Sequence, residues 1–216
     1  MKKILISLMT IGVVTAFMGV GVHALFTDTE TAANNTFTAG TLNLQVGATD
    51  PCTEAINIPA LKPTAAGNAA NWLVKNLGTL NGNLDITIGA ITNNENTITE
   101  PETAAGDVTA STGELGGLLK VAFWMDADKS GAWSSGDYYL NYDGSKVSWT
   151  SGTTLPTVAY AILNSFPHTW ASVQAIAASS DGGNFRVEYN FPDGGSTDNV
   201  AQGDSCVFNV TFVLNQ

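Results

Sequence analysis

The chain has 216 residues, with eight lysine and arginine side chains against nineteen aspartate and glutamate side chains, and its net charge is −11 at pH 7. So few cationic side chains exclude a basic nucleic-acid-binding surface. A hydrophobic share of 44% excludes a disordered acidic tail and suits one domain with a buried core. Because only 12% of the residues are charged, Thr, Asn, Ser and Gly carry most of the polarity, a composition that favours strands and turns.

Residues 1–24 have the pattern of a secretory signal peptide. Lys2 and Lys3 precede an apolar run over residues 4–22, and we expect signal peptidase to cleave after Ala24. The alternative is a retained membrane anchor, because the run is just long enough to span a bilayer. No second apolar run of that length follows, so we expect a secreted chain with no membrane span after cleavage. Cleavage removes two lysines, which leaves six cationic against nineteen acidic side chains, a net charge of −13.

The remaining chain is dominated by strand patterns. Apolar and polar residues alternate, or apolar residues follow one another, over residues 42–46, 72–77, 84–88, 118–124, 185–191 and 206–214. Turn sequences rich in Gly, Asn and Asp separate these segments, for example residues 181–183. Many short strands with polar connections predict an all-β fold, a jelly-roll-like antiparallel β-sandwich over residues 41–216 with a few short helices in loops.

Two regions do not follow the strand pattern. Residues 93–112 are polar and rich in Thr and Glu, which predicts a long loop. Residues 157–164 and 170–177 are rich in alanine, and we interpret them as short helices packed on the sandwich and separated at Pro167.

Cys52 and Cys206 are the two cysteines of the chain. An even pair in an exported protein predicts one disulfide, which would connect the first strand region to the last. The alternative is two separate buried thiols. Neither cysteine has a second cysteine at CxxC spacing, which argues against a redox or zinc role.

Residues 126–137 form a twelve-residue acidic loop that resembles a calcium-binding loop of EF-hand type. Oxygen ligands occur at the spacing that such a loop uses, with Gly131 at the sharp turn. The predicted calcium ligands are Asp126, Asp128, Ser130, Ala132 through its carbonyl, Ser134 and Asp137. Two features depart from the pattern, because the last ligand is Asp rather than Glu and the flanking segments look like strands. The alternative is a solvated acidic turn.

Several segments together resemble the TasA/camelysin family of bacterial and archaeal surface-fibre proteins. An aromatic-Asp-Thr-Glu segment follows the cleavage site, and an Ala-Gly-Thr-Leu-Asn-Leu segment follows that. The segments that carry the resemblance are residues 24–31, 35–44, 71–84, 202–205 and 214–216. They occur in the family's order and span the chain from end to end.

The resemblance implies a jelly-roll subunit that polymerises head to tail by donor-strand complementation, in biofilm matrix or in cell–cell contact. In that mode residues 25–40 of one copy would complete the sheet of the next, with Leu25, Phe26 and Phe37 in pockets. The alternative is that this segment forms an edge strand of its own domain. The partner is then a second copy of the chain, at the cell surface or outside the cell.

Catalytic signals are weak in this sequence. Camelysin has been regarded as a metallopeptidase, but zinc hydrolysis normally uses two or more histidines, and His168 is the one histidine left after cleavage. We therefore expect no catalytic residues and no enzymatic activity. A calcium-dependent module that binds surface glycans is a further alternative. Asn34 and Asn209 lie in Asn-x-Thr sequons, which matter where the host glycosylates its surface proteins.

Overall fold

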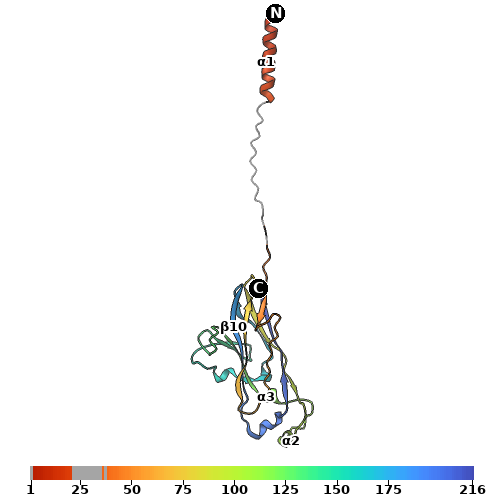
Figure 1. Ribbon diagram of the computed structural model, residues 1–216, viewed down its shortest axis with the longest axis vertical. Coiled ribbons are helices and arrows are strands. Elements are labelled where there is room, and N and C mark those ends of the chain that lie inside the picture. The colour runs from red at the N-terminus through yellow and green to blue at the C-terminus, as the bar shows by residue number, and fades with distance from the viewer. Residues whose placement is uncertain (1, 21–35, 37) are drawn as a thin grey trace. The chain divides into compact units, whose positions relative to one another are not determined.

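The computed structural model describes residues 2–20, 36 and 38–216, and the chain divides into two units, Met1–Ala39 and Gly40–Gln216 (Figure 1). The first unit contains helix α1, Lys2–Val20, which covers most of the predicted signal peptide. None of the helices in the described residues is long and apolar enough to cross a membrane. The predicted cleavage site and the predicted assembly residues Leu25, Phe26 and Phe37 lie outside the described residues.

The second unit is built from antiparallel strands. In chain order they are β1 Leu44–Val46, β2 Ala66–Asn76, β3 Gly82–Ile88, β4 Thr92–Asn94, β5 Lys120–Asp126, β6 Tyr138–Leu140, β7 Lys146–Ser148, β8 Ala161–Ile162, β9 His168–Ile176, β10 Ser180–Asn190, β11 Ser205–Val207 and β12 Val210–Asn215. The large sheet has the order β1-β2-β10-β5-β6-β7, with β8 paired to β5. The smaller sheet has the order β12-β3-β9, and β11 pairs with β4.

The core lies between the large and the small sheet. Phe212 of β12 contacts Trp72 of β2 and Phe185 of β10, with ring centroids 6.4 Å and 5.1 Å apart. Ile86 of β3 and Trp170 of β9 are buried in the same core. Burying aromatic side chains of this size is the main stabilising term of such a sandwich. The all-β antiparallel fold predicted from the sequence is therefore confirmed.

The prediction of a helix over residues 170–177 is wrong, because this segment is strand β9. Trp170, Val173 and Ile176 all face the core at a spacing of three, which resembles a helical period. The spacing arises from a bulge. Leu84 of β3 pairs with Gln174 of β9, and Ile86 pairs with Trp170. A step of two residues in β3 therefore corresponds to four residues in β9, and Ser172 within them has φ +48°. The bulge turns successive apolar side chains to the same face.

The other predicted helix, residues 157–164, is also corrected. It consists of the 3₁₀ turns η1, Thr157–Ala159, and η2, Leu163–Ser165, with the short strand β8 between them. The predicted turn at residues 181–183 lies inside β10, where the register against β2 shifts between Asp181 and Asn184.

Residues 93–112 are more ordered than the predicted long loop. They contain the end of β4 and helix α2, Glu100–Ala105, which ends at Gly106 with φ +100°. Helix α3, Leu115–Leu118, follows, and the 3₁₀ segment η3, Gly195–Ala201, packs against α2. These elements lie together at one end of the domain (Figure 1).

Candidate functional site

The predicted calcium loop connects β5 to β6, and strands flank it on both sides as the sequence predicts. Asp126 ends β5 and Asp137 immediately precedes β6; both are buried, whereas Asp128 is exposed. One carboxylate oxygen from each of the three aspartates lies within 4.8 Å of the corresponding oxygens of the other two. The fold therefore brings the three predicted acidic ligands together.

Asp126 already has partners for both of its carboxylate oxygens. The backbone N–H groups of Ser130 and Gly131 each donate to it at 3.0 Å. The guanidinium of Arg186 lies 3.4 Å from the same carboxylate and 4.9 Å from the centroid of the Trp124 ring. A buried carboxylate is thus neutralised by a buried arginine that is itself packed on an aromatic face.

The other two carboxylates of the loop are held in the same way. The N–H groups of Ala127 and Ser134 donate to Asp137 at 2.8 and 2.7 Å, although burial raises the pKa of Asp137. Hydrogen bonds from Ser130 and Ser134 lower the pKa of Asp128 to about 2. The loop therefore satisfies its acids largely with its own donors.

Two of the predicted ligands are engaged with other loop groups. The Ala132 carbonyl, a predicted ligand, accepts a hydrogen bond from the Ser130 hydroxyl at 3.0 Å. The Ser134 hydroxyl donates to Asp128 at 2.8 Å. The structure thus brings the three predicted acidic ligands together, and the role of the loop as a calcium site stays a prediction.

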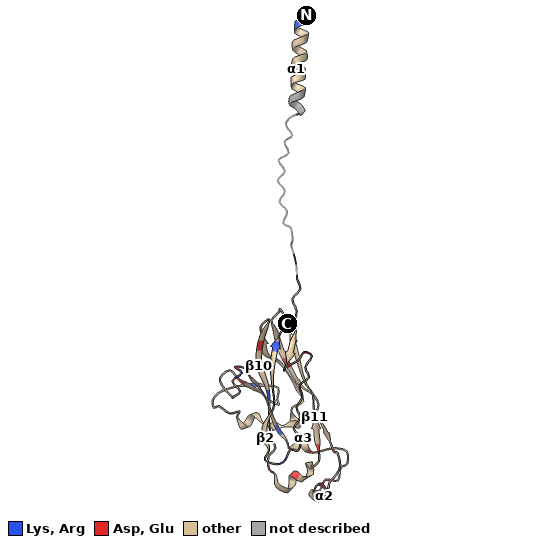
Figure 2. Cartoon of the chain, in the orientation of Figure 1, with Lys and Arg blue, Asp and Glu red and all other residues tan. Residues whose placement is uncertain are grey.

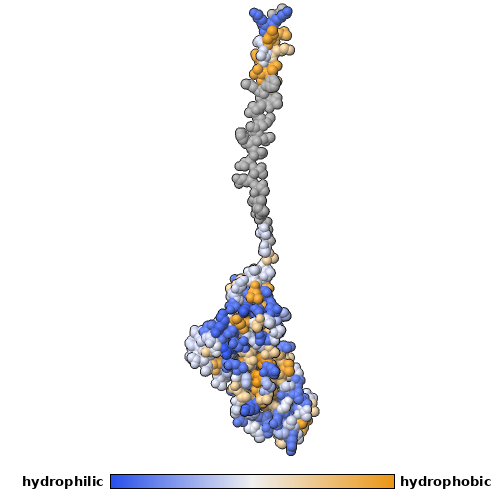
Figure 3. Space-filling view, in the orientation of Figure 1, coloured by the Kyte–Doolittle hydropathy of each residue, from blue (hydrophilic) through white to orange (hydrophobic). Residues whose placement is uncertain are grey.

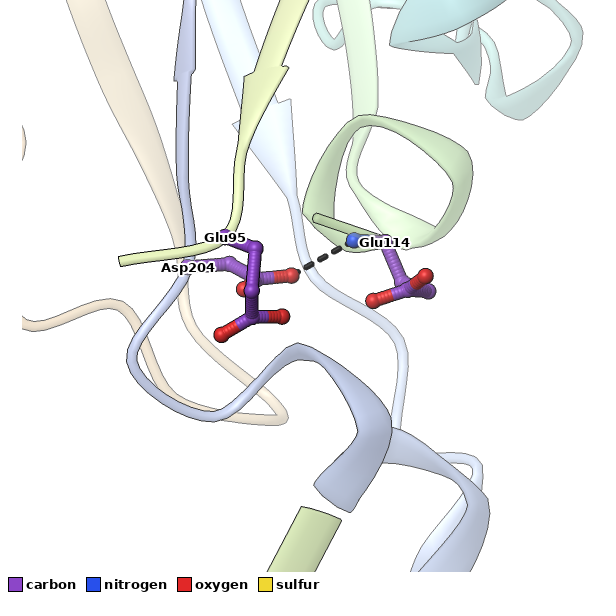
Figure 4. Close-up of side chains that lie close together, drawn as sticks. All are labelled: Glu95, Glu114 and Asp204. Carbon is purple, nitrogen blue, oxygen red and sulfur yellow. Dashed lines mark hydrogen bonds between the residues drawn. The ribbon is translucent and has the colours of Figure 1, made fainter. Parts of the chain in front are cut away.

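A second acidic group lies at the end of the domain that carries α2 and α3, and sequence reasoning missed it. It consists of Glu95, Glu102, Asp107, Glu114 and Asp204, called the carboxylate cluster below. Figure 4 shows Glu95, Glu114 and Asp204 close together, each on a different segment of the chain. The other charged side chains, of both signs, are scattered over the domain (Figure 2). Four of the five acids lie in residues 93–114, and this density of acids without a lysine or arginine is the signal that could have found them.

The backbone positions these five acids. Glu95 follows β4, Glu102 lies in α2, and Asp107 follows the end of that helix. Asp204 precedes β11 and accepts hydrogen bonds from the N–H groups of Glu114, at 2.5 Å, and of Leu115, at 3.2 Å, at the start of α3.

The chain packs tightly beside the cluster at Gly113. A Cβ atom at this residue would lie 2.7 Å from the Asn94 carbonyl oxygen and 2.9 Å from Cγ of Asp204. Glycine therefore permits the close approach of three segments here, and any larger residue would push them apart.

The cluster splits into two overlapping groups that share Glu95. One carboxylate oxygen each from Glu95, Glu114 and Asp204 lie within 4.8 Å of one another, and the same holds for Glu95, Glu102 and Asp107. Burial, followed by the negative charges of Asp204, Glu102 and Asp107, raises the pKa of Glu95 to about 7.

The pKa values of two other acids in the cluster move in opposite directions. The pKa of Glu114 is raised by burial and by the charges of Asp107 and Asp204. The pKa of Asp107 is lowered, because the N–H and the hydroxyl of Thr109 both donate to it at 2.8 Å. The surroundings of Glu95 and Glu114 therefore disfavour the charged form of both side chains.

A third feature is a mostly apolar cavity of about 830 Å³ on the side of the domain where β12 and the first part of β2 form sheet edges. We call it the apolar cavity, although Glu54, Lys62 and Asp198 also line it. Side chains from both sheets line it, including Trp72 of β2, Val187 of β10 and Phe212 of β12, together with residues 52–63, which form no strand. Apolar side chains reach the surface of the domain in Figure 3.

Cys52 and Cys206 both line this cavity, and both thiols are free. The predicted disulfide is therefore not formed in the structure. Burial, followed by the charge of Asp204, raises the pKa of the Cys206 thiol.

Two strand edges beside the cavity have no partner among the described strands. β1 pairs only with Val74–Asn76 of β2, so the Ala66–Trp72 part of β2 is unpaired on that side. β12 pairs with β3 on one side only. An inward-facing row begins at Phe208, just before β12, and continues in β12 with Val210, Phe212 and Leu214. It is only half-buried although it packs on the core.

The sequence model of the camelysin metallo-endopeptidase family matches residues 1–216, the whole chain. The chain belongs to this family. Camelysin and TasA are members of one family, so the resemblance found in the sequence is confirmed. The comparison with curated proteins gave no match.

Family membership corrects one prediction from the sequence. We expected no enzymatic activity, but the family is described as a metallo-endopeptidase, which points to a possible peptidase. That description implies a metal. The groups of side chains in the described residues that could hold one contain only carboxylates, which suit hard cations and differ from the nitrogen-rich sites typical of zinc. His168 is exposed and lies against Trp170, with ring centroids 5.2 Å apart.

Proposed function

We propose that this member of the camelysin family is a secreted subunit that polymerises into extracellular fibres by donor-strand complementation. The observation that carries the proposal is the apolar cavity of about 830 Å³ beside two unpaired strand edges. An added strand would gain backbone hydrogen bonds from an edge, and its alternate side chains would enter the cavity.

The half-buried row on β12 supports this proposal. Phe208, Val210, Phe212 and Leu214 point toward the core, yet each keeps part of its surface open. Residues 52–63 contribute Ile56 and Leu61 to the same core without forming a strand, so the cover over the cavity is irregular. If a regular strand replaced these residues, more apolar surface would be removed from water. Each Å² buried in this way stabilises the complex by about 25 cal/mol.

The proposed occupant is residues 25–40 of a second copy of the chain. This segment carries Leu25, Phe26 and Phe37 among threonines, a composition suited to an added strand. A segment of one copy in a cavity of the next is a heterologous contact, which produces open filaments when it does not close. The proposal places the partner, a second copy, and the fibres outside the cell.

Electron microscopy of the chain processed after Ala24 tests the assembly. We expect filaments, and we expect monomers when residues 25–36 are deleted. Val207→Arg and Val213→Arg form a matched pair, since both valines are exposed, at 56% and 43%, but only Val207 lines the cavity. Filaments should be lost in the Val207 variant and kept in the Val213 variant. Undiminished filaments in the deletion variant would remove the donor-strand proposal.

Peptidase activity is the second candidate, and the family description favours it. The test is the cleavage of casein by the purified chain, with added zinc, with added calcium and after EDTA. Cleavage that EDTA abolishes and that Glu95→Gln or Asp128→Asn changes would locate the reaction at one of the two acidic groups. No cleavage under any of these conditions would argue against this candidate.

Calcium at residues 126–137 is the remaining part of the proposal. Asp126, Asp128 and Asp137 are close enough to share one ion, and oxygen ligands on one short loop are typical of calcium sites. The existing hydrogen bonds and Arg186 compete with the ion, so we expect modest affinity, in the range of extracellular modules.

A further inference from the structure

The carboxylate cluster contains buried oxygens without partners. Six of its carboxylate oxygens are inaccessible to water and accept no hydrogen bond from a backbone, hydroxyl, amide or cationic donor: both of Glu95 and one each of Glu102, Asp107, Glu114 and Asp204. Within the cluster, Glu95 can share a proton with Asp204, and Glu114 with Asp107. Elsewhere in the described residues, only the Tyr138 hydroxyl and Nε of Arg186 are buried without a partner, apart from Thr99 beside the cluster. Buried acceptors are nearly always satisfied in proteins, so such a concentration requires an explanation.

Two members of the cluster are too deeply buried for solvent to supply the missing partners. Glu102 is 0% exposed and Asp107 is 7% exposed. One oxygen of Glu102 accepts a hydrogen bond from the N–H of Thr99, and one oxygen of Asp107 is held by Thr109, but the second oxygen of each has none. Both residues group around Glu95, so the free oxygens belong to one interior group.

No lysine or arginine among the described residues forms an ion pair with this group. The two ion pairs among the described residues are Lys129 with Asp181 and Arg186 with Asp126, and neither involves the cluster. Burying several like charges without a counter-charge is costly, and a bound cation removes that cost.

We propose that the carboxylate cluster is a calcium-binding site that the family description and the sequence motifs do not indicate. Its ligands are the unpartnered oxygens of Glu95, Glu102, Asp107, Glu114 and Asp204, with Glu95 shared between the two overlapping groups. Calcium takes six to eight oxygen ligands in irregular geometry, whereas magnesium requires near-octahedral geometry and retains several waters. Two overlapping groups of three carboxylates, already removed from water and irregularly arranged, therefore favour calcium.

The site would connect segments that are distant in the sequence. Glu95 follows β4, Glu102 lies in α2 and Asp107 follows it, Glu114 precedes α3, and Asp204 precedes β11. A cation here would hold together the end of the domain that carries α2, α3 and η3, so its main effect would be on stability.

Thermal unfolding of the full chain tests this proposal. After EDTA treatment and removal of the chelator, calcium at about 100 times its dissociation constant should raise Tm by about 5–10 °C. The same concentration of magnesium should raise it by less. In the double variant Glu95→Gln and Glu102→Gln, the calcium shift should fall to about 2 °C or less. The metal-free double variant should melt above the metal-free wild type, because two buried like charges are gone.

Asp128→Asn is the matched control, since it removes one acid from the loop at residues 126–137 and leaves the cluster intact. This variant should keep most of the calcium shift. The proposal is overturned if calcium leaves the wild-type Tm unchanged at about 10 mM, or if the double variant keeps the full shift and Asp128→Asn loses it. Terbium binding measured by equilibrium dialysis gives a second readout: wild-type protein and Asp128→Asn should bind terbium and release it to calcium, and the Glu95→Gln and Glu102→Gln double variant should bind less. Absence of terbium binding would also overturn the proposal.

Discussion

The chain has two groups of clustered acids, and they are built in opposite ways. In the loop at residues 126–137, backbone N–H groups, serine hydroxyls and Arg186 supply partners for the three aspartates. In the carboxylate cluster six buried oxygens lack partners, and no cationic side chain is paired with them in the described structure. The most strongly shifted acid of each group illustrates this difference: the pKa of Asp128 is lowered to about 2, and that of Glu95 is raised to about 7.

The comparison shows that a sequence pattern of cation ligands and a structural need for a cation are separate properties. A regular spacing of acids shows that oxygens can converge, but the same spacing also lets the loop satisfy them with its own N–H groups. Demand for a cation is measured by buried lone pairs that nothing else in the fold can reach. By that measure the cluster, which has no motif, ranks above the loop, which has one.

The largest expected effect on stability comes from removing the cationic side chain beside the loop, because its buried carboxylate then lacks a counter-charge, as in the cluster. Arg186→Met removes the cation beside buried Asp126, and it should lower the free energy of unfolding by about 3 kcal/mol. Calcium should restore part of that loss. Urea unfolding in EDTA and in calcium measures both effects. Lys129→Met is the control: its ion pair with Asp181 is exposed and 3.9 Å long, so its loss should cost about 0.5 kcal/mol or less. Equal losses in the two variants would mean that Arg186 does not stabilise buried Asp126.

A smaller effect on stability is expected from removing a hydrogen bond that a carboxylate of the cluster accepts. Thr109→Val keeps the side-chain volume but removes the hydroxyl that donates to Asp107 at 2.8 Å. The free energy of unfolding should fall by about 1–2 kcal/mol in EDTA, and by less in calcium, because the ion then stabilises the same carboxylate. Urea unfolding in the two media measures the difference. An equal loss in both would mean that no ion reaches Asp107.

The smallest expected effect belongs to the loop itself. In the Glu95→Gln and Glu102→Gln background, calcium should raise stability by only about 0.5 kcal/mol, because loop binding competes with hydrogen bonds that already exist. Adding Asp128→Asn to this background should abolish the remaining stabilisation by calcium. Differential scanning calorimetry can resolve it. A residual shift as large as that of the wild type would reverse the ranking of the two regions.

The sequence predicted features that depend on neighbouring residues. The alternation over residues 206–214 corresponds to β11 and β12, and the loop ligands lie within twelve residues of one another. It failed where the outcome depends on contacts between distant segments. Strand β9 looked helical because a bulge at Ser172, fixed by pairing with β3, changes its period from two to three.

The carboxylate cluster had no local pattern for a related reason. Asp204 is more than a hundred residues from Glu95 in sequence, and only the pairing of β11 with β4 brings them together. Glu102 and Asp107 lay in a segment interpreted as a polar loop, where acids are ordinary. Their burial follows from α2 packing on η3, which the sequence did not indicate.

Strand β11 is three residues long and lies between two of the features described above. Asp204, immediately before it, belongs to the carboxylate cluster, and Cys206 and Val207 within it line the apolar cavity. A cation that fixes Asp204 and a strand that packs on Val207 would therefore act on the same short stretch of backbone. The two binding events would be thermodynamically linked, and whatever free energy the first adds to the second, the second would add to the first.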